Sequence, residues 1–117
     1  AELAKNLNLL AKIRINQVFY EEAHQLIMQA LKIADSVTNF NPIIRAESFT
    51  LLAELATEQQ DFSAAETALG MAEQIFLRIP EPEAKIYAWF VIQKADLYFK
   101  RELFDQALKI INNDRFI

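Results

Sequence analysis

The sequence predicts an all-α fold built from antiparallel helix pairs, and three observations support this prediction. The 117 residues include only 1 glycine and 3 prolines, too few for the many tight turns of an all-β fold. Strong helix formers (Ala, Leu, Glu, Gln and Lys) fill the stretches between the prolines. Short similar segments recur at a fixed interval, which is typical of helical repeat proteins. Hydrophobic residues make up 53% of the chain, so a core can form without disulfides or metal.

An aromatic residue marks each copy of the repeat, at Tyr20, Phe62 and Phe104, which gives an interval of 42 residues twice. Large apolar residues stand seven and thirteen positions on either side of each aromatic residue. Small residues stand nine positions before it (Ala11, Ala53, Ala95) and three positions after it (Ala23, Ala65, Ala107). Small residues let two helices approach closely and large ones fill the space between neighbouring pairs, so successive pairs are predicted to stack.

Six helices are predicted, and the first three span about 2–18, 20–38 and 42–59. The second begins with Glu21 and Glu22, whose negative charges stabilise a helix N-terminus. The third begins after Asn41, an N-cap residue, with Pro42 at the first helical position.

The last three helices are predicted over about 62–79, 82–101 and 103–113. Asp61 is an N-cap residue for the fourth helix, Pro80 ends it, and Pro82 starts the fifth. Gly70 lies inside the fourth helix, where it costs about 1 kcal/mol relative to alanine. It is expected to allow close helix packing, and a hinge is the alternative. Asp114 replaces the small residue that the other copies carry, so the sixth helix is predicted to fray there.

The chain shows no linker, charge block or low-complexity segment, so residues 1–117 are expected to form one domain. The repeats are placed at about 4–41, 42–80 and 82–117. The longest strongly apolar run covers residues 86–92, far short of the roughly 20 residues that cross a bilayer. No signal peptide is visible and the chain has no cysteine, so a cytoplasmic location is expected.

Several kinds of chemistry are excluded by residue counts. Without cysteine there is no thiolate, disulfide or Cys–zinc site, and a single histidine excludes multi-histidine metal sites. A single glycine excludes a glycine-rich phosphate loop. His24 is expected to be an ordinary histidine rather than a catalytic one. We therefore predict no catalytic residue, no metal site and no cofactor, and we expect the chain not to be an enzyme.

The charge pattern disfavours two classes of partner. The formal net charge of −4 argues against nucleic acid and anionic membranes. A loose basic cluster near the end of the sequence lacks interleaved aromatic residues on one face; it consists of Lys94, Lys100, Arg101 and Lys109. Glu47, Glu54 and Glu58 share one helix face and are interpreted as a solvated or ligand-facing acidic stripe rather than a metal or acid–base site.

The repeat columns resemble the tetratricopeptide repeat: a small residue, an aromatic residue nine positions later, a small residue three further on, then a large apolar and another small residue. The resemblance covers nearly the whole chain. The usual repeat has about 34 residues, so this chain is similar to the long variants found in kinesin light chain and in bacterial signalling proteins. The resemblance implies a right-handed superhelical solenoid of three antiparallel helix pairs, in which the first helix of each pair lines a concave groove.

The resemblance also supplies candidates for partner binding on these first helices. They are Lys5, Asn8, Lys12 and Asn16 in the first copy, Glu47, Thr50, Glu54 and Glu58 in the second, and Trp89, Gln93, Asp96 and Lys100, with Ile92 and Phe99, in the third. Trp89 has two interpretations, as core filling and as an anchor for a partner. The residues at the positions of the carboxylate clamp of chaperone-binding members are Asn8, Lys12, Leu51, Trp89 and Gln93, so that clamp is absent.

The function expected from these observations is a protein–protein or protein–peptide interaction module or scaffold. The alternative is a sensory or regulatory domain that binds a peptide or small ligand within a larger signalling or transcription-regulating protein. The sequence closes with apolar residues that no further helix covers: Ile110, Ile111, Phe116 and Ile117. Two alternatives are expected for this face: self-association through the terminal helices, or a chain that is a fragment of a longer protein, with more protein after it.

Overall fold

The computed structural model describes residues 2–37, 40–80 and 84–113. These residues form six α-helices and no strand, and 86% of them are helical, which confirms the all-α prediction. The helices are α1 (Glu2–Asn16), α2 (Tyr20–Ser36), α3 (Pro42–Glu58), α4 (Phe62–Leu77), α5 (Ala84–Lys100) and α6 (Phe104–Asn113). The predictions for Pro82, Asp114, Phe116 and Ile117 lie outside the described residues.

The two predicted N-caps are confirmed. The side-chain oxygen of Asn41 accepts a hydrogen bond from the backbone N–H of Ile43 at 2.9 Å, and Pro42 occupies the first turn of α3. The carboxylate of Asp61 accepts from the N–H of Ala64 at 3.2 Å. Each cap satisfies a backbone donor that the helix itself leaves unpaired.

A three-residue turn joins each odd-numbered helix to the next, at 17–19, 59–61 and 101–103. The middle residue of every turn adopts the left-handed conformation, with φ of 66°, 63° and 62° at Val18, Gln60 and Glu102. The following residue then donates its N–H to a carbonyl five positions back, as Phe19 does to Arg14 at 2.8 Å. The other two turns repeat this bond at 2.8 and 2.9 Å, so the 42-residue interval of the sequence is also an interval of backbone geometry.

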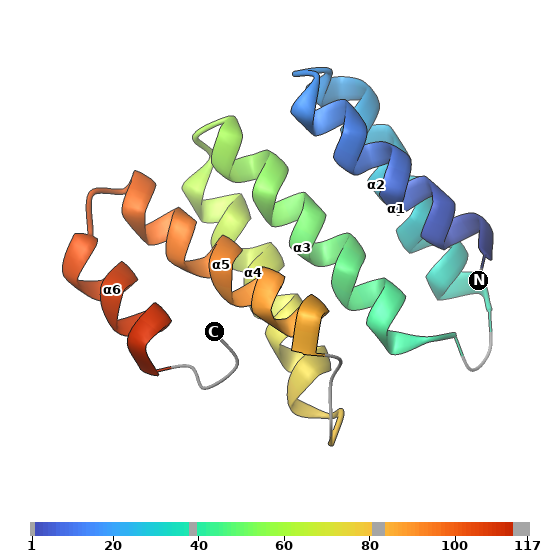
Figure 1. Ribbon diagram of the computed structural model, residues 1–117. Coiled ribbons are helices and arrows are strands. Elements are labelled where there is room, and N and C mark those ends of the chain that lie inside the picture. The colour runs from blue at the N-terminus through green and yellow to red at the C-terminus, as the bar shows by residue number, and fades with distance from the viewer. Residues whose placement is uncertain (1, 38–39, 81–83, 114–117) are drawn as a thin grey trace.

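The helices pack in a regular order (Figure 1). The packing is most extensive within the pairs α1–α2, α3–α4 and α5–α6. Helices α1, α3 and α5 lie side by side, with α3 in contact with both of the others. Among the described residues α2, α4 and α6 do not contact one another, and α6 packs only on α5. The molecule measures 40 × 34 × 20 Å, and its smallest dimension is about two helix diameters.

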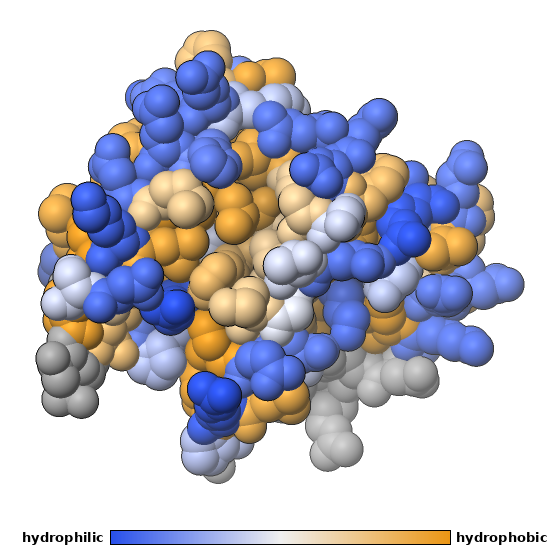
Figure 2. Space-filling view, turned by 180° about the vertical axis from the view of Figure 1, so that it is seen from behind, coloured by the Kyte–Doolittle hydropathy of each residue, from blue (hydrophilic) through white to orange (hydrophobic). Residues whose placement is uncertain are grey.

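The core follows the columns of the repeat. All six alanines that stand nine before or three after the aromatic residues are buried. Ala46, Ala53, Ala65 and Ala68 form one cluster at the α3–α4 contact, where small side chains let the helices approach closely. The ring of Phe76 on α4 packs against two rings of α5, at centroid distances of 5.3 Å to Tyr87 and 5.2 Å to Phe90. Figure 2 shows the molecule from behind, where hydrophobic side chains reach the surface between hydrophilic ones.

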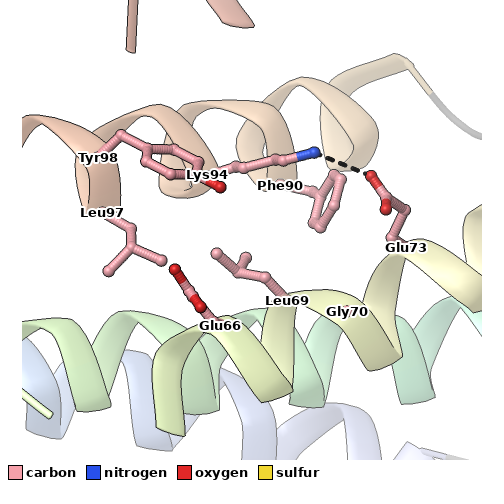
Figure 3. A pocket seen from close by; sticks show the side chains of 8 residues that line it. All are labelled: Glu66, Leu69, Gly70, Glu73, Phe90, Lys94, Leu97 and Tyr98. Carbon is pink, nitrogen blue, oxygen red and sulfur yellow. Dashed lines mark hydrogen bonds and ion pairs between the residues drawn. The ribbon is translucent and has the colours of Figure 1, made fainter. Parts of the chain in front are cut away.

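The expectation that Gly70 allows close helix packing is wrong. A Cβ atom at Gly70 would meet nothing within 4 Å. Gly70 instead faces a hollow of about 260 Å³ between α4 and α5, into which Leu69 and Leu97 point and which the Lys94–Glu73 ion pair (3.0 Å) spans (Figure 3). The close approach of α4 occurs on its alanine-rich side, so its only glycine is not needed for it.

Candidate functional site

A second hollow, of about 360 Å³, opens over the three odd-numbered helices. Residues from α1, α3 and α5 line it: Lys5, Asn6, Asn8, Leu9, Lys12, Glu47, Leu51, Lys85, Ile86 and Trp89. Five of these were predicted as binding residues from the sequence: Lys5, Asn8, Lys12, Glu47 and Trp89. We call this region the three-helix hollow.

Lys12 and Trp89 meet across the three-helix hollow. The ammonium of Lys12 on α1 lies 4.4 Å from the centre of the Trp89 ring on α5, within the range of a cation–π contact. Helix α3 lies between the helices that carry these residues. Trp89 is half-buried and also packs against the core cluster that contains Leu51 and Leu55. Trp89 therefore fills the core, as one interpretation expected, and also lines the hollow; its role as an anchor for a partner stays a prediction.

Asn8 lines the three-helix hollow and links α1 to α3 through its side-chain amide. It is buried, and its amide nitrogen donates to the carbonyl of Ile44 and to Oε1 of Glu47, each at 3.2 Å. Its amide oxygen accepts from the hydroxyl of Ser48 at 2.8 Å. These bonds tie α1 to α3 and hold Glu47 in place. Asn8 thus has a structural role in the hollow, since its polar atoms are already satisfied.

The rim of the three-helix hollow is basic although the chain as a whole is acidic. The side chains of Lys5, Lys12 and Lys85 are exposed at the rim, and Glu47 is the acidic residue that lines the hollow. The formal net charge of the chain is −4. An excess of lysines around an apolar floor attracts negatively charged groups, and the low-dielectric wall strengthens this attraction.

The predicted acidic stripe continues along α3 beyond the hollow, where Glu58 forms an ion pair and Oε1 of Glu54 is buried and accepts no hydrogen bond from the described residues. Nζ of Lys100 lies 2.5 Å from Glu58 and 3.4 Å from Asp96. Burial lowers the pKa of Lys100, but its hydrogen bond to Glu58 and the nearby carboxylates outweigh this effect and raise it. Burial raises the pKa of Glu54, and the positive charge of Lys12 opposes the rise. This end of the face is a network of ion pairs rather than an open acidic site.

The remaining predicted residues lie in different surroundings. Thr50 is fully buried and its hydroxyl donates to the carbonyl of Ala46 at 2.8 Å, so it does not line the hollow. Asn16 is exposed at the end of α1, and Gln93 is half-buried. Ile92 and Phe99 are exposed, and the Phe99 ring packs on Phe104 at 5.2 Å.

The five residues of the hollow that were not predicted from the sequence are Asn6, Leu9, Leu51, Lys85 and Ile86. The repeat interval could have identified two of them, because Leu9 and Leu51 are equivalent by the 42-residue interval to Gln93, which was predicted to bind a partner. The other three have no such signal. Lys85 and Ile86 stand at the start of α5, and only the packing of α5 on α3 brings them beside α1.

Three of the four residues of the loose basic cluster form ion pairs. Lys94, Lys100 and Arg101 of the basic cluster pair with Glu73, Glu58 and Glu66 respectively. His24 is exposed on α2.

In the part of the chain that the structure describes, no group of three or more acidic or histidine side chains could hold a metal ion. None of the helices described is both long and apolar enough to span a membrane. Comparison with protein-family models, with curated proteins and with solved structures finds no match to this chain.

Proposed function

We propose that the chain is a non-catalytic interaction module that holds a segment of a partner protein, or a peptide, in the three-helix hollow. The observation that carries this proposal is the meeting of Lys12 and Trp89 over α3, which makes one site from three helices. We further propose that the fold is a short right-handed superhelical solenoid of the tetratricopeptide type. A cytoplasmic location suits the cysteine-free sequence.

The packing order supports a curved shape. Among the odd-numbered helices α3 contacts both α1 and α5, whereas the described parts of α2, α4 and α6 do not contact one another. A layer whose members lie closer together is the inner layer of a bend, so the face formed by α1, α3 and α5 is the concave one. A concave face buries more of an elongated partner than a flat face does, as in other helical repeat proteins.

The chemistry of the three-helix hollow indicates what kind of segment fits. Its volume of about 360 Å³ lies within the roughly 300–1,000 Å³ range of binding pockets. Leu9, Leu51, Ile86 and the open part of Trp89 offer apolar contact for one large side chain. The rim lysines favour carboxylates beside it. We therefore propose as the occupant an acidic segment that carries one bulky apolar residue.

The test is a selection of peptides from a random displayed library on the immobilised chain, followed by titration of the enriched peptides. Trp89 is the only tryptophan, so its emission reports occupancy of the hollow directly. We expect enrichment of acidic residues around an apolar one. Lys12→Glu should raise the Kd of these peptides at least about tenfold, which corresponds to about 1.4 kcal/mol. Lys32→Glu makes the same charge change at an exposed position on α2 and should leave Kd within about twofold.

Two results would contradict this proposal. One is an enriched set of peptides without acidic residues. The other is an equal loss of affinity in Lys12→Glu and Lys32→Glu, which would show that only the overall charge of the chain matters. Lys12→Glu is preferred to a substitution of Trp89, because Trp89 also packs on the core and its removal would lower stability.

A further inference from the structure

Helix α2 packs against α3, and helix α4 packs against α5 in the same way. We call these contacts, α2–α3 and α4–α5, the stacking junctions. At the α4–α5 junction Leu69 and Leu97 point into the same space, and Lys94 pairs with Glu73 (Figure 3). At the α2–α3 junction Ile27 and Leu55 belong to one core cluster, and Arg45 pairs with Asp35.

The 42-residue interval identifies the same positions at the two ends of the molecule. Ile111 on α6 is equivalent to Ile27 and Leu69, and Ile13 on α1 is equivalent to Leu55 and Leu97. The four residues in the stacking junctions are at most 5% exposed, whereas Ile13 is 44% exposed and Ile111 is 40% exposed. Each end of the molecule therefore presents one half of a stacking junction.

Each end face carries further apolar residues. On α6, Phe104 and Leu108 are exposed beside Ile111, one and two turns apart on the same helix face. On α1, Leu3 is exposed and Leu10 is half-buried on the face of Ile13. Leu108 stands where α4 carries Glu66, and Leu3 stands where α3 carries Arg45. Each end face thus has an apolar residue at a position where one of the two internal junctions has a charged one.

We propose that two copies of this chain associate end to end, with α1 of one copy packed on α6 of the other as a third stacking junction. The occupant is a second copy, because the α6 face and the α1 face correspond to the two halves of one stacking junction. The two faces differ, so the contact is heterologous and leaves one free face of each kind. Longer head-to-tail assemblies follow at higher concentration. This proposal does not rest on the proposed function.

Sedimentation velocity of the 117-residue chain, from roughly 1 µM to 1 mM, tests the proposal. The mass should rise with concentration. Ile13→Asp and Ile111→Asp each remove one face and should each remain a monomer over the whole range. An equimolar mixture of the two variants should form a 1:1 dimer and nothing larger, because each variant keeps the face that the other has lost. Circular dichroism checks that both variants are folded, and Leu108→Asp provides a second variant of the α6 face.

Met71→Asp is the matched control. Met71 lies on α4 and is 44% exposed, as Ile13 is, but it lies outside both end faces, so its substitution should leave the association unchanged. A wild-type chain that stays monomeric at the highest concentration overturns the proposal. So does an Ile13→Asp variant that associates alone while Ile111→Asp does not, because that result indicates a symmetric pairing of α6 with α6.

Discussion

At the scale of single residues, the three turns between paired helices use a backbone conformation that their side chains do not favour. Val18, Gln60 and Glu102 all have φ near +60°, the region that glycine occupies without a steric penalty. The turn requires this conformation because the next N–H must reach a carbonyl five residues back. The sequence could not reveal it, since no glycine or asparagine marks these positions.

We expect Gln60→Gly to stabilise the protein by about 0.5–1 kcal/mol, because glycine removes the clash of Cβ in the left-handed conformation. Urea denaturation should show a higher midpoint at an unchanged slope. Gln59→Gly is the control, because Gln59 has a φ of −85° and gains nothing from glycine. Equal effects of the two substitutions would show that the strain at Gln60 is absent.

At the scale of helices, most of the architecture could be predicted from the sequence. Every helix end that falls in the described residues lies within two positions of its prediction. Asn41, Pro42, Asp61 and Pro80 act on the backbone next to them, so their effect depends little on tertiary packing. Gly70 was misinterpreted because a glycine in a helix indicates only a missing side chain. Whether a neighbour fills the vacant space depends on the packing of α5.

Gly70→Ala should therefore stabilise the protein by about 1 kcal/mol, because alanine restricts the unfolded chain and favours the helix while its Cβ meets no atom within 4 Å. This change corresponds to a rise in Tm of roughly 4 °C for a domain of this size. Calorimetry measures it. A lower Tm would support the expectation, rejected above, that Gly70 allows close contact between helices.

At the scale of the whole molecule, the candidate site could be predicted only in part. A stripe of predicted positions along three helices included Lys5, Lys12 and Trp89, which line the three-helix hollow. It also included Thr50, which is buried. Its hydroxyl can be buried because it donates to a carbonyl in its own helix. The contribution of Lys85 and Ile86 depends on how α5 is rotated against α3. Helix α5 also packs through Tyr87 and Phe90 on Phe76 of α4, a contact that no local pattern encodes.

Proton NMR on the chain without any partner can measure directly the contact between Lys12 of α1 and Trp89 of α5. With a single tryptophan, the indole signals belong to Trp89 without ambiguity. We expect nuclear Overhauser contacts between this ring and the side-chain methylenes of Lys12, and upfield shifts of those methylenes from the ring current, since the ammonium lies 4.4 Å from the ring centre. Normal Lys12 shifts with no contact to Trp89 would show that the two side chains do not meet over α3, and the three-helix hollow would not exist.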